Sequence, residues 1–199
     1  MNLNTSVAGL TSDEIPEEIY SGFCDYCRGD GDFDVQVIKK PSEPMAGIIE
    51  LLPAAIAVYL AKPFFDSFLK SLGSDAYTVV KDKLSKILLK SKSINSIALA
   101  SSDLKVSEPR EFSRVFSIHS NSIDGRPIKF LMPLNPSEDE SQQIVGALID
   151  DMNAYFSDDA NSTIRMLISD STTRGIMYFR YSFEAATWEE LSSLEIANS

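Results

Sequence analysis

An apolar segment followed at once by a lysine-rich one constrains this chain more than any other feature, and the two together run from Met45 to Lys92. The stretch from Leu51 to Ala61 carries no charged residue. A membrane-spanning helix needs about 20 apolar residues, whereas runs of about 10–14 residues are typical of a buried core or an interfacial segment. The sequence therefore predicts helices that pack into a protein core, with contact at a membrane surface as the alternative.

Two consecutive helices are expected in this region, at about residues 45–72 and 74–92. Pro53 and Pro63 would kink or break the first helix, because an interior proline removes a hydrogen bond and clashes with the preceding turn. Gly73 ends that helix. In the second helix, apolar residues recur at the spacing of one helix face, which predicts that this face is buried. The residues on that face are Ala76, Tyr77, Val80, Leu84, Ile87 and Leu88.

Two shorter patterns precede this region. Thr11 and Glu14 have the spacing of a capping box, which predicts a short helix over residues 11–23. Residues 33–38 alternate between apolar and polar, which predicts an edge strand. We therefore expect residues 1–92 to form a helical region with one strand at 33–38.

The C-terminal half has a more regular pattern of strands around one helix. The dipeptide Asp124-Gly125 favours a tight hairpin turn, because both positions tolerate positive φ. Ser137 and Glu140 form a capping box that opens a helix. The expected strands are Phe112–Ile118, Arg126–Met132, Thr163–Ile168 and Gly175–Phe183, and a short final helix is expected at Trp188–Leu194.

Together these patterns predict an α+β fold with a helical N-terminal half and a ββαββ C-terminal half. The sheet of that second half is expected to be mainly antiparallel, with the helix covering one face. The serine-rich residues 93–110 are weakly patterned, so they are expected to connect residues 1–92 to an α+β domain at 111–199. The same order is also compatible with one continuous domain.

The charge of the chain is unevenly distributed. The formal net charge is -11, of which residues 1–34 carry -7, residues 35–136 carry +5 and residues 137–199 carry -9. An acidic chain argues against nucleic-acid binding, because contacts to phosphates need lysine and arginine. It is compatible with a basic protein partner, since charge complementarity aids the rate and specificity of encounter.

We accordingly expect a soluble, non-enzymatic interaction module that binds an unidentified protein partner, with a basic protein as one candidate, through acidic residues of its C-terminal part. The expected contacts are Glu138, Asp139, Glu140, Asp150, Asp151, Asp158 and Asp159. An acidic surface also keeps a protein in solution without binding anything. The sequence leaves the identity of the partner and the oligomeric state open.

The alternative is a membrane-associated protein, either an effector or a peripheral anchor, in which residues 45–92 lie at the bilayer. Apolar side chains would enter the membrane while neighbouring lysines meet anionic headgroups. The expected membrane contacts are Leu51, Ile56, Leu60, Phe64, Phe65, Lys81 and Lys83. Charged residues and prolines within the segment argue against a spanning helix.

Catalytic and cofactor chemistry has little support. Cys24 and Cys27 form one C-x-x-C, which supplies half of a zinc site or a redox pair, and His119 is the only histidine. No nucleophile motif accompanies His119, so an enzyme or metalloprotein using these three residues is the least supported hypothesis. We expect no catalytic residue and no cofactor. The few cysteines and the absence of a secretory signal pattern favour a cytoplasmic location.

Three carboxylates, Asp30, Asp32 and Asp34, have the spacing that opens a calcium loop. A loop of that type needs glycine at its sixth position and glutamate at its twelfth. This chain has Val35 and Pro41 at those positions. No metal site is therefore expected there.

Overall fold

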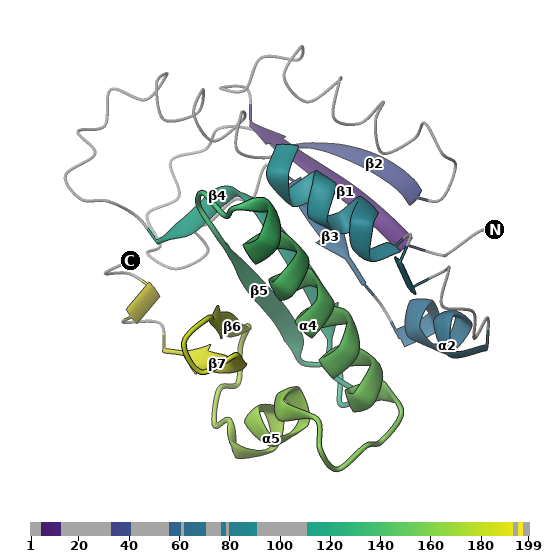
Figure 1. Ribbon diagram of the computed structural model, residues 1–199, viewed down its shortest axis with the longest axis vertical. Coiled ribbons are helices and arrows are strands. Elements are labelled where there is room, and N and C mark those ends of the chain that lie inside the picture. Colours follow the sequence, from purple (N-terminus) through teal and green to yellow (C-terminus); the bar gives the residue numbers. More distant parts are fainter. Residues whose placement is uncertain are drawn as a thin grey trace.

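The computed structural model describes residues 5–12, 33–40, 56–60, 62–70, 77–78, 80–90, 111–192 and 195–196. These residues form helices and one mixed β-sheet, an α+β arrangement (Figure 1). The strands are β1 (Thr5–Ser12), β2 (Phe33–Lys40), β3 (Ile56–Tyr59), β4 (Phe112–Asn121), β5 (Pro127–Pro133), β6 (Met177–Ser182) and β7 (Thr187–Leu191). The helices are α2 (Lys62–Lys70), α4 (Glu138–Phe156) and α5 (Thr163–Asp170), together with residues 77–78 and 80–90, here called the lysine-rich helix.

Parallel and antiparallel pairs alternate across the seven-stranded sheet, whose order is β2-β1-β3-β4-β5-β6-β7. The pairs β2/β1, β3/β4 and β5/β6 are parallel, and the remaining neighbours are antiparallel. A parallel pair needs a long connection, which is usually helical. The chain runs through α2 and the lysine-rich helix between β3 and β4, and through α4 and α5 between β5 and β6. The sheet as a whole is therefore mixed. In the C-terminal half, for which a mainly antiparallel sheet is expected, β4/β5 and β6/β7 are antiparallel and β5/β6 is parallel.

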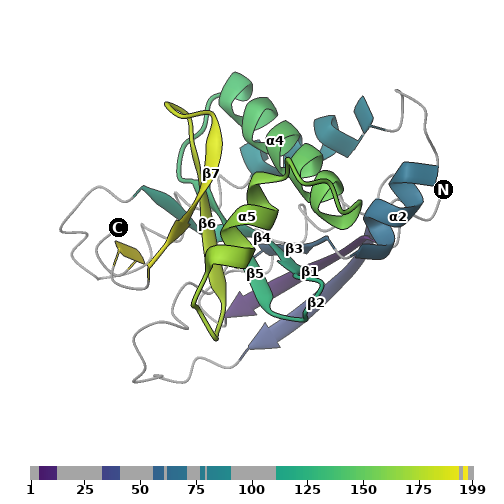
Figure 2. The same cartoon turned by 90° about the horizontal axis from the view of Figure 1, so that it is seen from below.

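The main hydrophobic core lies between one face of the sheet and the helices (Figure 2). Phe130 and Trp188 pack with ring centroids 4.9 Å apart on the sheet side, and Phe65 of α2 packs on Phe156 of α4 at 5.2 Å. Successive side chains of a strand point to opposite faces, so a smaller apolar cluster forms on the other face of the sheet. Its members are Phe112, Leu131, Tyr178 and Leu191, with Ile196 packed against them.

The hairpin turn and the long helix of the C-terminal half confirm the sequence prediction. Gly125 adopts a φ of 86°, the left-handed conformation in which glycine is at no steric disadvantage, whereas Asp124 does not take a positive φ. At the start of α4, the Glu140 N–H donates to Ser137 Oγ at 3.1 Å and the Ser137 N–H donates to the Glu140 carboxylate at 2.7 Å. The expected capping box is thus complete.

The apolar segment forms a strand and a helix instead of one helix. The predicted helix at 45–72 is wrong over Ile56–Tyr59, which is β3, whereas Lys62–Lys70 is helical as α2. A short apolar run does not distinguish a buried strand from a buried helix, and pairing with both β1 and β4 makes this one a strand. Pro63 lies in the first turn of α2, where a proline is tolerated. Residues 45–55 and 71–72 lie outside the described residues.

The N-terminal half contributes strands as well as helices. Residues 5–12 form β1, so the predicted helix at 11–23 is wrong at its first two residues, and the rest of it lies outside the described residues. Residues 33–38 lie within β2, at one edge of the sheet. The sheet therefore contains strands from both sides of residues 93–110. The second predicted helix, at 74–92, is helical at residues 77–78 and 80–90.

The segment Thr163–Ile168 is helical, although the sequence predicts a strand there. Ser162 caps α5 by accepting a hydrogen bond from the N–H of Arg165 at 3.2 Å. Ile164 and Ile168, which lie on the same helix face because they are four positions apart, are both buried. The cap and this buried face together explain the helix.

The final helix begins later than predicted. Over most of Trp188–Leu194 the chain is a strand, since β7 pairs with β6 as far as Leu191. The helical residues 195–196 follow a local capping contact, in which Ser192 Oγ donates to the Glu195 carboxylate at 2.7 Å. Aromatic residues such as Trp188 are common in half-buried strands. Pairing with β6 makes this segment a strand and not a helix.

Replacing Ser137 by alanine should lower the free energy of unfolding by about 1 kcal/mol, because α4 loses the side chain that caps it. Denaturant unfolding measures this change. The control is Ser169→Ala, at an exposed position of α5, which should change the free energy of unfolding by less than about 0.5 kcal/mol. Equal effects of the two substitutions would contradict the role given to the capping box.

Candidate functional site

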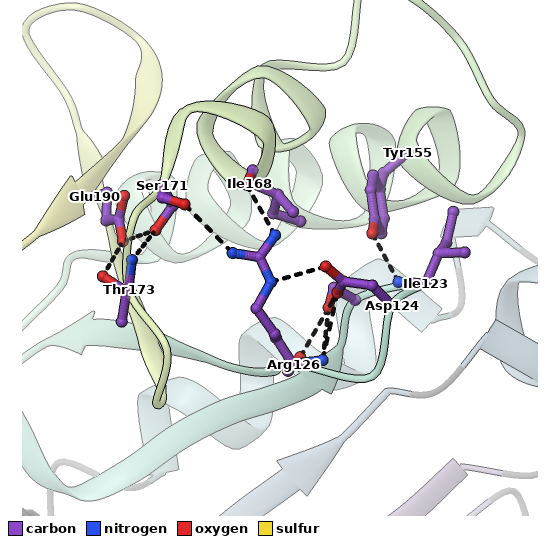
Figure 3. A network of polar contacts seen from close by, with 9 residues as sticks. Ile123, Asp124, Arg126, Tyr155, Ile168, Ser171, Thr173 and Glu190 are labelled. Atoms are coloured by element: carbon purple, nitrogen blue, oxygen red, sulfur yellow. Dashed lines mark hydrogen bonds and ion pairs between the residues drawn. The ribbon is translucent and has the colours of Figure 1, made fainter.

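A polar network joins the β4–β5 turn to α5, and Arg126 lies at its centre (Figure 3). The Arg126 guanidinium donates to the carbonyl oxygens of Ile168 at 2.9 Å and of Ser171 at 3.5 Å. It also pairs with the Asp124 carboxylate at 2.8 Å. The two carbonyls lie at the C-terminal end of α5, where unpaired acceptors and the helix dipole favour a cation. One side chain therefore fixes α5 to the turn.

Further contacts extend this network to α4 and β7. The Ile123 N–H donates to the Tyr155 hydroxyl of α4 at 2.7 Å. Ser171 Oγ and Thr173 Oγ1 both donate to one carboxylate oxygen of Glu190 in β7, at 2.6 and 3.0 Å. The turn, both helices and the last strand are thus connected by side chains (Figure 3).

The surface formed by residues 122–126 and 163–176, here called the α5 pole, carries exposed apolar side chains. Among the residues that the structure describes, the exposed large apolar side chains are Ile123, Met166 and Ile176, with 62%, 52% and 38% relative exposure. All three belong to the α5 pole. A single exposed apolar residue is ordinary, whereas several in segments that pack together are a candidate for a binding site. The sequence analysis missed all three, because an isolated apolar residue shows no periodic pattern.

The acidic residues that were expected to contact a partner do not form one patch. They divide between the two ends of α4. The first turn holds Glu138, Asp139 and Glu140, and the C-terminal side holds Asp150, Asp151, Asp158 and Asp159. Because α4 has 19 residues, it is about 28 Å long. The two acidic groups are therefore well separated.

The acids on the C-terminal side largely support the loop between α4 and α5. The Asp151 carboxylate accepts a hydrogen bond from the Thr163 N–H at 3.0 Å, and burial raises the pKa of Asp151. Asp158 pairs with Arg165. The Asp159 carboxylate accepts a hydrogen bond from the Asn161 N–H at 2.9 Å. Part of the acidic character of this region is therefore used within the fold.

Asp150 and Lys81 both contact Tyr77 where α4 lies beside the lysine-rich helix. The Tyr77 hydroxyl donates to Asp150 at 3.2 Å, and burial, followed by the Asp150 charge, raises the pKa of Tyr77 to about 12. The Lys81 ammonium lies 5.9 Å from the centre of the Tyr77 ring. The Lys81 side chain lies against α4 at Gly146, where a Cβ added to the glycine would be only 2.9 Å from Lys81 Nζ. Lys83 lies on the same helix and is partly exposed.

The apolar residues that were expected at a membrane are mostly in the core. Leu60, Phe64 and Phe65 are at most 1% exposed, so they would reach a bilayer only if the fold opened. Ile56 is the first residue of β3, and Leu51 lies outside the described residues. Within the described parts of the chain, no helix combines the length and apolar character needed to cross a membrane.

His119 and Ser117 form a close polar pair on the face of the sheet opposite the main core. Ser117 Oγ and His119 Nε2 are 2.7 Å apart, and Lys129 of β5 lies directly across from His119. Burial, followed by the charge of Lys129, lowers the pKa of His119 to about 4. Burial lowers the pKa of Lys129 to about 8. His119 is therefore neutral at neutral pH, and the tautomer of its ring decides whether Nε2 or the serine hydroxyl is the donor.

The burial of this pair argues against catalysis. Ser117 is 1% exposed and Lys129 is 6% exposed, so a substrate would not reach the serine hydroxyl. In a catalytic triad, a third group orients the histidine through its other ring nitrogen. Among the described residues, Ser117 is the one side chain that hydrogen-bonds to the His119 ring. The pair is better explained as two buried polar groups that satisfy each other.

Metal binding has no site in the part of the chain that the structure describes, where no group of three or more histidine, cysteine or acidic side chains is placed to hold an ion. Cys24 and Cys27 lie outside the described residues, as do Asp30 and Asp32. Asp34 belongs to β2. The sequence-based expectation for these residues therefore stays a prediction.

Comparison with protein-family models, with curated proteins and with solved structures finds no match for this chain. No relative therefore suggests a role for the α5 pole or for the pair of His119 and Ser117. The chemistry of the surfaces themselves has to indicate the function.

Replacing Arg126 by glutamine should lower the free energy of unfolding by about 1.5–3 kcal/mol, because α5 loses charge-assisted hydrogen bonds at its C-terminal end. Thermal or denaturant unfolding measures the loss. Arg174→Gln, at an exposed position of the same pole, is the matched control and should change the free energy of unfolding by less than about 0.5 kcal/mol. A similar loss in both variants would show that Arg126 does not hold α5.

The stability of the protein should fall as the pH is lowered from 6.5 to about 4, because the unfolded chain protonates His119 in this range while the folded chain does not. A shift of this size corresponds to at most about 3 kcal/mol. Denaturant unfolding across this pH range should show a shallower loss for His119→Gln than for the wild type. Parallel losses in the two proteins would contradict the lowered pKa of His119.

Proposed function

We propose that the chain is a non-enzymatic protein-interaction module that binds a basic protein partner through the α5 pole. The observation that carries this proposal is the exposure of Ile123, Met166 and Ile176 in the turn and the α5 segment, which Arg126 joins. Apolar side chains at the centre of a contact, with polar groups around them, are typical of protein interfaces.

The α5 pole suits binding because its parts are fixed before a partner arrives. Arg126 holds the end of α5 to the turn. Glu190 holds the segment after α5 to β7 through Ser171 and Thr173. A surface that is already ordered loses less conformational entropy on association.

Acidic side chains around the apolar residues favour a partner with basic residues at matching positions. Asp158, Asp159 and Asp170 are exposed at this end of the molecule, and Asp150 lies further back along α4. Asp158 already pairs with Arg165. Asp150, Asp159 and Asp170 remain for a partner to meet, beside the exposed Arg174 of the α5 pole. The acids in the first turn of α4 lie at its far end, outside this proposed contact.

The same proposal places the protein in the cytoplasm, which its two cysteines favour. Membrane association is not proposed as a second function, because Leu60, Phe64 and Phe65 are buried in the core. Catalysis by His119 is not proposed either, since its neighbour Ser117 is buried.

Photo-crosslinking in the source cells tests the proposal. A photoreactive amino acid at position 123 or at position 166 should form a covalent adduct with the same partner protein, because both positions lie in the proposed contact. Position 62, at the exposed start of α2, is the control and should give no adduct with that protein. Adducts with the same protein from all three positions would contradict the proposal.

The double substitution Ile123→Ser and Met166→Ser should reduce recovery of the crosslinked or affinity-captured partner at least about tenfold, because apolar anchors dominate the binding energy of an interface. Both side chains are exposed, so the free energy of unfolding should change little. Unchanged recovery from a folded double variant would place the contact elsewhere.

A further inference from the structure

The strand β7 forms one edge of the sheet and is paired on one side (Figure 2). All five of its residues pair with β6. In the described parts of the chain, no backbone hydrogen bond reaches Thr187–Leu191 from any element except β6. In an antiparallel pair, alternate residues direct their N–H and C=O groups away from the partner strand. Among the described residues, none therefore pairs with the donors and acceptors on the outer side of β7.

Packing on both faces of the sheet fixes this edge. Trp188 is 1% exposed and packs into the main core, with its ring centroid 4.9 Å from that of Phe130. Leu191 packs into the cluster on the opposite face, beside Tyr178. A strand held from both faces loses little further freedom when another strand is added to it.

The chain around this edge is mainly acidic, although Arg180 of β6 pairs with Glu189 at 3.0 Å. Residues 181–199 contain Glu184, Glu189, Glu190 and Glu195, and no lysine or arginine. Charged residues protect an edge strand from pairing with another copy of its own chain. Two copies of β7 would bring glutamates against glutamates. The same charges attract a basic strand, so the residues that oppose self-pairing also select the partner.

We propose that β7 receives an extended basic segment of the partner protein as an additional strand of the sheet. This inference rests on the proposed function and specifies how the partner is engaged. Backbone hydrogen bonds supply the affinity, and lysine or arginine side chains opposite the glutamates supply the selectivity. Because Ser171 and Thr173 bind Glu190 of β7, the added strand would end beside the α5 pole, and one partner would contact both.

A labelled short peptide of alternating lysine and threonine tests this inference on the full chain. Fluorescence anisotropy measures binding, and hydrogen exchange shows where the peptide lies. We expect saturable binding that weakens as salt is added, with slower amide exchange in Thr187–Leu191. The emission of Trp188, the only tryptophan in the chain, should change as well. A peptide of alternating glutamate and threonine should not bind.

The double substitution Glu184→Gln and Glu189→Gln should weaken binding of the basic peptide at least about threefold, because two attractive charges are removed. The matched control is Asp66→Asn with Asp82→Asn, which removes two exposed charges from α2 and the lysine-rich helix. The control should bind as the wild type does. The absence of binding, binding without slower exchange in β7, or equal weakening in both variants would overturn the inference.

These outcomes are distinct from those of the crosslinking experiment. Crosslinks from positions 123 and 166 without protection of β7 would retain the α5 pole as the contact and overturn strand addition alone. Protection of β7 without crosslinks from the two positions would support strand addition and place the rest of the contact outside the α5 pole.

Discussion

The sheet depends on the pairing of β3, a strand of four residues, with a neighbour on each side. Val58 at its centre has a partner in both β1 and β4 and is fully buried. The end of the strand is fixed by Leu60, whose carbonyl accepts a hydrogen bond from Ser120 Oγ at 2.7 Å. Without β3, β1 and β2 would be a separate two-stranded unit, which is at best marginally stable in water. The apolar segment therefore joins the N-terminal strands to the rest of the fold.

The sequence predicts those parts of the fold whose causes are local. The capping box at Ser137 and the turn at Gly125 depend on a few neighbouring residues, and both form as predicted. The sequence predicts a strand where α5 forms and a helix where β7 forms. A short apolar or aromatic segment is compatible with both the helical and the strand periodicity, so its pattern does not decide between them. For β7 the deciding contact is its pairing with β6. The parallel pairs escaped prediction for the same reason, since no local pattern specifies which strands become neighbours.

The charge of the candidate surface could be predicted, but its arrangement could not. The acidic character of the C-terminal part follows directly from its composition. Its division into two groups does not, because it depends on the length of α4, which separates Glu138 from Asp158. Pairing with Arg165 then uses part of that charge within the fold. The exposure of Ile123 and Met166 follows from the way α5 docks against the turn. An apolar residue in a loop has no periodicity, so packing alone decides whether it is buried.

The contact between the lysine-rich helix and α4 makes the side chain allowed at position 146 depend on the one at position 81. Any side chain at position 146 would displace the ammonium of Lys81, whose Nζ lies 2.9 Å from where the added carbon would be. The displaced ammonium would also leave the ring of Tyr77. Descendants of this chain that keep Gly146 can keep a long side chain at position 81, whereas a larger residue at 146 requires position 81 to shorten or turn away. Because the ammonium is the end of a flexible side chain, moving it aside costs little, and the main loss is its contact with the Tyr77 ring.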